Sequence, residues 1–226
     1  PVTVHTATQS RVNTAELARF ERMLDAADAA CEVAVKCRQG ARSCELPTDD
    51  AEGKLRVVLA TIHALCDGED VYIAGIMEHI EEAGVHSGDS ACVIPPVTLS
   101  AANRKEMIQT TTRVSKALGV VGLVNVQYAV QGGVVYVLEV NPRASRTVPY
   151  VAKATGLPIA RFATRLMLGQ KLSDLGDLTK RGAGMHFIKA PVFPWRRFTV
   201  RDVVLGPEMH STGEVMGVGR SFGETH

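Results

Sequence analysis

The sequence of 226 residues predicts an α+β fold in which antiparallel strands and helices share a core. Two apolar runs, Gly122–Val130 and Val134–Val140, flank a short glycine-containing turn, a pattern typical of a β-hairpin. Ser100 precedes an apolar stripe at helical spacing, and residues 149–168 show that spacing with one break. The length corresponds to about one and a half average domains, enough to bury a substantial core.

The middle and C-terminal parts of the chain give the clearest element boundaries. The helix after Ser100 should present one stripe, made of Met107, Thr111, Val114 and Leu118. Val71–Ile76 is predicted as a strand, and the helical segment 149–168 should be interrupted at Gly156-Leu157-Pro158. Beyond Gly182 the sequence predicts short strands and turns.

The first sixty or so residues differ in composition from the rest. Before Val71 the chain has one aromatic residue, Phe20, and few glycines. Asn13–Lys36 is predicted as a helix because it combines capping-box spacing with apolar residues at steps of three and four, and residues 37–53 as a loop. An apolar run at 57–65 is compatible with a strand or a short helix. The shift predicts two regions, residues 1–63 and 64–226.

Charge and cysteine content exclude several classes of protein. Lys and Arg number 25 and Asp and Glu 24, so the chain has no strongly basic field for nucleic acid. No apolar run approaches the roughly 20 residues that a bilayer requires, and no secretory signal is visible. Five cysteines without a CxxC pair disfavour a disulfide framework or structural zinc. We therefore expect a cytoplasmic protein without nucleic-acid or membrane partners.

The hairpin carries the most informative pattern. A three-residue loop, Gln131-Gly132-Gly133, would set the register, since glycine allows a positive φ. The expected pairs are Val130 with Val134, Gln127 with Val137, Asn125 with Glu139, and Leu123 with Asn141. Asn125, Gln127, Glu139 and Asn141 then share one face, while Val124, Val126, Tyr128, Tyr136, Leu138 and Val140 share the other. A two-residue loop would place Gln127 opposite Leu138 and split the polar set.

These polar residues suggest a metal and phosphate site. Clustered carboxylate and amide oxygens suit a hard cation such as Mg²⁺. Arg143 and Arg146 follow directly, and guanidinium groups bind phosphate oxygens and offset charge in phosphoryl transfer. The pattern therefore favours nucleotide-dependent phosphoryl transfer, the alternative being a half-exposed hairpin with a merely hydrated face. A second, weaker candidate is Glu78-His79 with the loop 84–89, whose glycines permit close backbone approach to a ligand.

Several long motifs, in order, resemble the large subunit of carbamoyl-phosphate synthase, specifically its second, carbamoyl-phosphate-forming ATP-grasp unit. The matching segments are GIMEHIEEAGVHSGDS at 75–90, GLVNVQYAV at 122–130, VLEVNPRASRTVP at 137–149, KATG at 153–156 and LGPEMHSTGEVMG at 205–217. The resemblance extends from about Ala64 to the C-terminus and implies the C-terminal lobe of an ATP-grasp fold. Such a lobe is a mainly antiparallel sheet flanked by helices, and we expect the hairpin at its centre.

The resemblance also implies an activity and its residues. The activity is phosphorylation of carbamate by ATP, feeding arginine and pyrimidine synthesis, with Mg²⁺ or Mn²⁺ and with ammonia from a glutamine-hydrolysing small subunit. The remainder of the large subunit is the second expected partner. The implied metal ligands are Gln127, Glu139 and Asn141, of which Gln127 and Glu139 also contact nucleotide. The implied adenosine-contacting residues are Gly84, Val85, His86 and Ser87, and the implied catalytic residues are Arg143 and Arg146.

Two departures from the family pattern leave an alternative open. Leu59 stands where the family pattern has a glutamate in an acidic strand, and no glycine-rich loop occurs between Pro1 and Ala64. The alternative is therefore a non-catalytic nucleotide- or metal-binding remnant. An ATP-grasp carboxylase is disfavoured by the motifs at 84–90 and 205–217. Residues 1–63 are interpreted as an out-of-frame or unrelated stretch or, given the capped helix, as an alternative N-terminus.

Overall fold

The computed structural model describes residues 57–81, 85–179, 184–195, 205–206 and 208–225. The strands are β1 (Val58–Asp67), β2 (Val71–His79), β3 (Cys92–Ile94), β4 (Val121–Gln131), β5 (Val134–Asn141), β6 (His186–Val192) and β7 (Gly213–Gly219). The helices are α2 (Ala101–Ala117), α3 (Val148–Thr155), α4 (Ile159–Met167), the 3₁₀ helix η1 (Leu172–Leu175) and α5 (Phe222–Thr225). The helix predicted at Asn13–Lys36 and the loop predicted at 37–53 lie outside the described residues.

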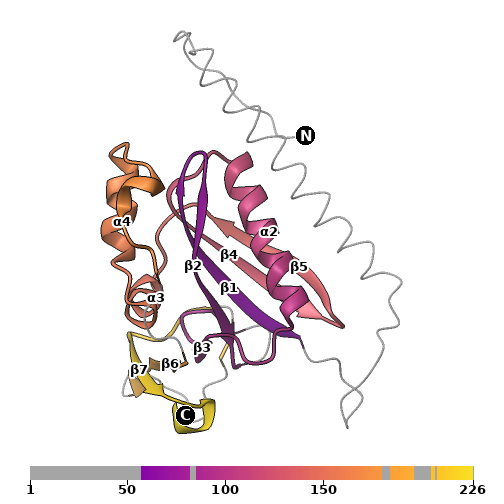
Figure 1. Ribbon diagram of the computed structural model, residues 1–226. Coiled ribbons are helices and arrows are strands. Elements are labelled where there is room, and N and C mark those ends of the chain that lie inside the picture. The colour runs from indigo at the N-terminus through magenta and orange to yellow at the C-terminus, as the bar shows by residue number, and fades with distance from the viewer. Residues whose placement is uncertain (1–56, 82–84, 180–183, 196–204, 207, 226) are drawn as a thin grey trace, which may run out of the picture.

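The described strands form one antiparallel sheet in the order β5-β4-β1-β2-β3-β6-β7, with helices packed on it (Figure 1). This confirms the predicted α+β class with a mainly antiparallel sheet. The ambiguous run at 57–65 belongs to strand β1, which pairs with both β2 and β4. The expectation that the hairpin would occupy the centre of the sheet is wrong, because β5 is an edge strand. Among the described residues, no helix has the length and apolar character needed to span a membrane.

One face of the sheet is buried beneath α2. Ser100 caps this helix by accepting a hydrogen bond from the Asn103 amide, as its position before the apolar stripe predicts. Met107 is fully buried against alternate residues of β1 and β4. This cluster contains Ala60, Ile62, Ala64, Cys66, Val124, Val126, Tyr128 and Val130. Every second residue of the two strands therefore contributes to a core beneath α2.

The opposite face is covered at one end by α3 and α4. Both helices pack on the cluster that includes Leu65 of β1 and Leu123 of β4. The predicted interruption at 156–158 separates the two helices. Gly75 permits a close approach, since a Cβ there would lie 2.8 Å from Cγ1 of Val151 on α3. The other end of this face lies beyond the helices and is polar.

The hairpin turn differs from the predicted three-residue loop. Gln131 pairs with Val134, so the turn contains only Gly132 and Gly133. Their φ angles, +57° and +81°, match a two-residue turn in which both central residues are left-handed. The paired glycines thus support the tighter turn, and the predicted pair Val130 with Val134 is replaced by Val130 with Val135.

A β-bulge then restores the polar face that a two-residue turn would otherwise have split. Tyr128 pairs with Val137, but the next pair is Gln127 with Glu139, so Leu138 is the extra residue. Asn125 consequently pairs with Asn141. The cross-strand partners predicted for Gln127, Asn125 and Leu123 are therefore wrong, because the strand register differs. The four polar residues nevertheless share one face, as predicted.

The tighter turn and the bulge together change which apolar residues face the core. Val135, Val137 and Val140 pack against the cluster beneath α2. Leu138, predicted on that face, is instead 56% exposed, and Tyr136 pairs with Ala129 on the opposite face. The Tyr136 prediction failed because the turn is one residue shorter than expected, and the Leu138 prediction failed because that residue is the bulge itself.

Candidate functional site

The polar end of the sheet consists of two rows of residues that run across three strands. In the first row, Thr61 of β1 pairs with Gln127 of β4, which pairs with Glu139 of β5. In the second, His63 pairs with Asn125, which pairs with Asn141. Paired residues in an antiparallel ladder point to the same side. These six residues, here called the polar face, therefore lie together on the side of the sheet opposite α2.

The predicted metal ligands contact one another directly or through neighbours on this face. Gln127 Nε2 donates a hydrogen bond of 2.7 Å to Glu139 Oε2. Asn141 Nδ2 donates to Asn125 Oδ1 over 3.4 Å. Glu139 is exposed, whereas Asn141 is buried. An exposed carboxylate beside amide oxygens is the kind of donor set that a hard cation binds.

The donor set fits a cation that is shared with a ligand. Within the ranges that the structure describes, no three His, Cys, Asp or Glu side chains gather as a metal site. A cation on the polar face would therefore have one carboxylate, Glu139, and the amide oxygens of Gln127 and Asn141. Mg²⁺ commonly binds in this way, through one or two carboxylates supplemented by phosphate oxygens and water.

The arginine loop, residues 142–147, leads away from the polar face. Its start is fixed by a hydrogen bond of 2.8 Å from the Arg143 amide to the Asn141 carbonyl. The Arg143 guanidinium donates to the carbonyl of Ala144, and Arg146 Nη1 lies 2.8 Å from Sδ of Met209. Both arginine side chains are exposed. The loop therefore presents two accessible guanidinium groups next to the predicted metal ligands.

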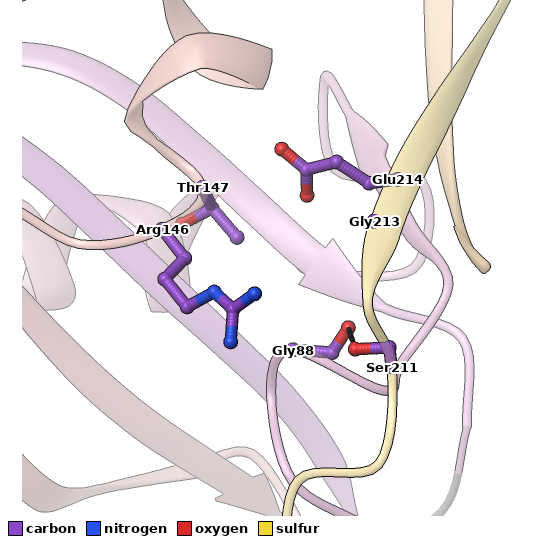
Figure 2. A pocket seen from close by; sticks show the side chains of 6 residues that line it. All are labelled: Gly88, Arg146, Thr147, Ser211, Gly213 and Glu214. Atoms are coloured by element: carbon purple, nitrogen blue, oxygen red, sulfur yellow. Dashed lines mark hydrogen bonds between the residues drawn. The ribbon is translucent and has the colours of Figure 1, made fainter. Parts of the chain in front are cut away.

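Arg146 lines a cavity of about 110 Å³, as Figure 2 shows. The cavity is lined by Gly88, Arg146, Thr147, Ser211, Gly213 and Glu214. Arg146 and Thr147 come from the arginine loop and Gly88 from the loop after β2, whereas Ser211 precedes β7 and Gly213 and Glu214 begin it. Three segments far apart in sequence thus meet around a space large enough for a few water molecules or a small anion.

The glycine-histidine loop, residues 85–90, contains the predicted adenosine contacts Val85, His86 and Ser87, whereas Gly84 lies outside the described residues. The His86 amide donates to the Gly206 carbonyl over 2.8 Å. Buried Asp89 accepts hydrogen bonds from the amides of His210 and Ser211, at 2.7 and 2.8 Å. Two sequence motifs, 84–90 and 205–217, are therefore joined in one structural unit, a contact that local sequence patterns did not predict.

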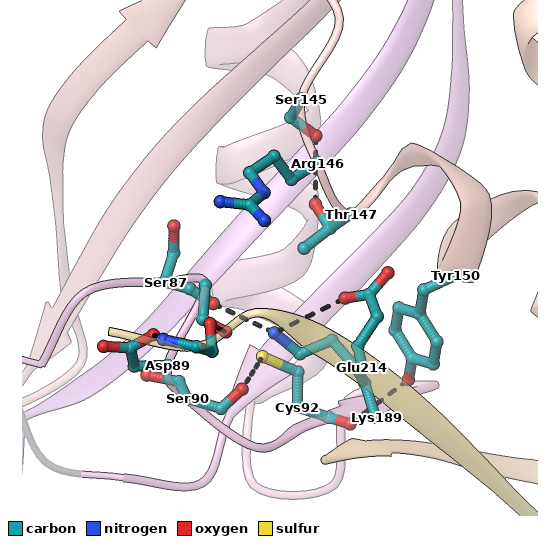
Figure 3. Close-up of polar contacts among 12 residues, drawn as sticks. Ser87, Asp89, Ser90, Cys92, Ser145, Arg146, Thr147, Tyr150, Lys189 and Glu214 are labelled. Carbon is teal, nitrogen blue, oxygen red and sulfur yellow. Dashed lines mark hydrogen bonds and ion pairs between the residues drawn. The ribbon is translucent and has the colours of Figure 1, made fainter. Parts of the chain in front are cut away.

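Lys189 of β6 joins this loop to the cavity and was missed by the sequence analysis (Figure 3). Its side chain is fully buried, and Nζ donates to the Ser87 carbonyl over 3.0 Å. Glu214 Oε2 lies 4.0 Å from the same nitrogen. A lysine among the apolar residues of a strand was the available signal, because buried lysine requires a polar partner.

His63 was also missed as a site residue, although it was visible as a histidine in an apolar run. It is 1% exposed, and its Nε2 lies 2.7 Å from Ser145 Oγ and 2.9 Å from Thr147 Oγ1. Burial, followed by the nearby His79 and Lys189, lowers the pKa of His63 to about 4. The imidazole is therefore neutral at physiological pH and contacts the arginine loop by hydrogen bonding alone.

The second candidate from the sequence, Glu78-His79, has a structural role. Glu78 is buried and accepts hydrogen bonds from the amides of Val97, Thr98 and Leu99, which lead into α2. His79 Nε2 lies 3.0 Å from Thr61 Oγ1. Neither residue lines the cavity described above.

The described cysteines, Cys66 and Cys92, are buried and form no disulfide. Burial raises the pKa of Cys66 to about 11 and that of Cys92 to about 12. Both thiols are therefore protonated at neutral pH, which agrees with their interpretation as small core residues rather than nucleophiles.

Comparisons with known proteins identify the family of the chain. Residues 61–175 match the family model described as "Carbamoyl-phosphate synthase L chain, ATP binding domain". The carbamoyl phosphate synthase large chain of Rubrobacter xylanophilus is 58% identical over 162 residues, which cover 72% of this chain and 15% of that protein. The large chain of Archaeoglobus fulgidus gives the same values. The chain thus spans about 15% of the length of these curated relatives.

Solved structures agree on the fold. The biotin carboxylase domain of a single-chain bacterial carboxylase superposes with a TM-score of 0.53 at 19% identity, covering 61% of this chain and 33% of that one. A Rhizobium etli pyruvate carboxylase gives a TM-score of 0.52 at 19% identity, covering 65% of this chain and 15% of that one. At this identity the likeness concerns the fold alone. The family match, which spans β1 through η1 and includes every predicted metal ligand, decides the assignment: the chain belongs to the ATP-binding-domain family of the carbamoyl-phosphate synthase large chain.

Proposed function

We propose that the chain forms part of the site at which ATP phosphorylates carbamate, giving carbamoyl phosphate and ADP. In this reaction a carbamate oxygen forms a bond to the γ-phosphorus while the bond to the bridging oxygen of ADP breaks. The observation that carries the proposal is the polar face, where Gln127, Glu139 and Asn141 lie beside the arginine loop. Oxygen ligands next to guanidinium groups are the recurring components of phosphoryl-transfer sites.

Each group of residues would have a distinct role. Glu139, Gln127 and Asn141 would hold Mg²⁺ or Mn²⁺, which neutralises phosphate charge when bound. Arg143 and Arg146 would bind phosphate oxygens and offset the negative charge that develops during transfer. Val85, His86 and Ser87, together with Gly84, would contact the adenosine. The glycine-histidine loop supports this role because the Ser211 hydroxyl and Lys189 Nζ donate to the backbone carbonyls of Gly88 and Ser87 and fix the loop.

The proposal extends to the complete enzyme of which such a domain forms part. The remainder of the large subunit would supply the glycine-rich and basic components that ATP-grasp sites need. A glutamine-hydrolysing small subunit would supply ammonia, and the product would enter arginine and pyrimidine synthesis in the cytoplasm. Residues 1–63 would form a region separate from the ATP-grasp part, 64–226. The chain spans about 15% of the length of its relatives. The other components of the enzyme are therefore inferred from family membership.

One observation favours the alternative, a chain that binds nucleotide or metal without catalysis. β1 places Thr61 and His63 in the rows of the polar face, and Leu59 pairs with Ala129 next to them. None of these three residues carries a carboxylate, although the family pattern has acidic residues along this strand. Glu139 is therefore the single acidic residue of the six in the polar face, which weakens the hold on a cation.

Titration calorimetry and an activity assay separate the two functions. ATP is titrated into the full chain with and without Mg²⁺, and ADP release is then measured with carbamate present. Mg²⁺-dependent binding with ADP release supports the catalytic proposal. Binding without release supports the alternative, and no binding in either condition contradicts both.

A further inference from the structure

His63 makes its side-chain hydrogen bonds to one segment, the arginine loop. Its Nε2 is 2.7 Å from Ser145 Oγ and 2.9 Å from Thr147 Oγ1, and the two hydroxyl oxygens are 3.0 Å apart. Its other ring nitrogen, Nδ1, is buried and has no hydrogen-bond partner among the described residues. A histidine that only filled space in the sheet would leave both nitrogens unsatisfied, which is unfavourable. The polar contacts of this residue are thus directed to the loop.

The arginine loop alternates between residues that face His63 and residues that face solvent. Ser145 and Thr147 turn their hydroxyls toward the imidazole, whereas Arg143 and Arg146 are exposed. Figure 3 shows the bond between Ser145 and Thr147 with the Arg146 side chain directed away from it. Hydrogen bonds that anchor the Ser145 and Thr147 hydroxyls fix the backbone of the loop. They therefore also fix the positions from which the arginine side chains extend.

Thr147 supplies an independent indication. It is the N-cap residue of α3, yet its side chain makes no capping hydrogen bond. Threonine at this position normally accepts a hydrogen bond from an amide of the first helical turn, which stabilises the helix. Here its hydroxyl lies 2.9 Å from His63 Nε2 instead. Thr147 has helical backbone angles and a proline follows in the first turn, so its hydroxyl is directed to a residue 84 positions away in sequence and not to an amide of α3.

We propose that His63 is a positioning residue: by binding Ser145 and Thr147 it holds the arginine loop so that Arg146 faces the cavity and Arg143 stays beside Asn141. His63 itself is buried in β1 and does not line the cavity. That the arginines bind phosphate oxygens rests on the function proposed above. That the loop is held by His63 does not, and the two statements are tested separately.

The first experiment measures amide hydrogen exchange in the full chain without ligand. The reporters are the amides of Arg143, Val148 and Val151, which bond to the carbonyls of Asn141, Ser145 and Thr147. In His63→Ala they should exchange about tenfold faster than in the wild type, corresponding to the loss of one or two hydrogen bonds. His63→Gln, whose amide can reach the hydroxyls, should recover much of the protection. His79→Gln is the matched control, because His79 is a buried histidine that bonds to Thr61 in the sheet rather than to the loop.

A loop-side variant keeps the test decisive if His63→Ala does not fold. Ser145→Ala combined with Thr147→Val removes both hydroxyls without altering β1 and should expose the same amides. The proposal is overturned if this double variant leaves their exchange unchanged. It is also overturned if His63→Ala accelerates exchange in β4 and in the loop equally, since that would indicate general destabilisation.

The second experiment measures the affinity for ATP with Mg²⁺. His63→Ala should weaken ATP binding about tenfold, which corresponds to the loss of one or two hydrogen bonds that hold the arginine loop. His63→Gln should restore the affinity. If the wild-type chain does not bind, the proposed function fails while hydrogen exchange still decides the role of His63. If the wild type binds and His63→Ala binds equally well, the positioning role is contradicted and the proposed function stands.

Discussion

At the end of the sheet beyond α3 and α4, the two faces of strands β1 and β4 differ in character although they are made by alternating residues of the same segments. Beneath α2, alternate residues such as Ile62, Val124 and Val126 form a closed apolar core. On the other side, Thr61, Asn125 and Gln127 form polar rows that extend to β5. Burial of apolar side chains stabilises the first face, and specific hydrogen bonds order the side chains of the second.

This difference separates stability from function along a single strand. Removing buried methyl groups beneath α2 costs transfer free energy and leaves a cavity. Replacing an exposed polar residue on the opposite face leaves the packing intact, so its effect should appear in ligand binding. Four substitutions or conditions test this division, and they are ordered by their expected effect on the free energy of unfolding.

The largest effect is expected from Ile62→Ala. Ile62 of β1 is fully buried beneath α2. Its replacement by alanine should lower the free energy of unfolding by about 2–5 kcal/mol. Urea denaturation measures the change. A loss below about 1 kcal/mol would mean that this core repacks freely, which contradicts the close packing expected beneath α2.

Acid should destabilise the folded chain through His63 of the polar face and His79 of β2. Burial is the main cause that lowers the pKa of each from the ordinary histidine value of 6.5 to about 4. The unfolded chain therefore binds more protons between these values, so stability is present above pH 6.5 and is lost as the pH falls toward 4. Each histidine should contribute up to about 1.4 kcal/mol per pH unit.

Denaturation of the wild type and of His79→Gln is measured between pH 6.5 and about pH 4.5, where the folded and unfolded forms differ in histidine protonation. The free energy of unfolding of the variant should fall less steeply with pH, because only His63 remains to contribute to the slope. Identical slopes in the two proteins would show that His79 is not held neutral by the fold.

A smaller effect is expected from Tyr128→Phe beneath α2. The buried Tyr128 hydroxyl donates to the Met107 carbonyl over 3.0 Å and lies 2.7 Å from Thr111 Oγ1. Its removal should cost about 1 kcal/mol, since it leaves the packing of the ring unchanged. Thr112→Val on the same helix is the control, because that hydroxyl bonds only to the carbonyl of Ile108 and is half-buried. Equal losses would indicate that the tyrosine contact is unimportant.

The smallest effect on stability is expected from Glu139→Gln. Its bond to Gln127 is exposed, so the free energy of unfolding should change by less than about 0.5 kcal/mol. Mg²⁺-dependent ATP binding should nevertheless weaken at least about tenfold, because the substitution removes the carboxylate of the donor set. Glu106→Gln, an exposed carboxylate on α2, should leave binding unchanged. Equal effects of the two substitutions on calorimetric affinity would contradict the assignment of the site.

Local sequence patterns predicted those parts of the fold that depend on neighbouring residues. The Ser100 cap, the break at 156–158 and the hairpin follow from residues within a few positions of each other, and the structure contains all three. Strand β1 was left ambiguous because residues 60–66 are buried without interruption, which removes the alternation that distinguishes a strand.

The candidate site could be predicted only where it lies within the hairpin. Gln127, Glu139 and Asn141 were found together because one turn connects them. Lys189 and Ser87 are 102 positions apart, and His63 and Ser145 are 82 apart, so no local pattern relates them. The adenosine and arginine assignments remain predictions.

The bulge at Leu138 has a consequence for changes in chain length. Val137 pairs with Tyr128 and Glu139 with Gln127, so Leu138 has no position of its own in the ladder. Deleting this exposed residue would leave both pairs in place and turn the hairpin into a regular ladder. Deleting Val140 would instead shift Asn141 to the other side of the sheet. We therefore expect natural variants of this hairpin to differ in length at position 138 and to keep the spacing between 139 and 141.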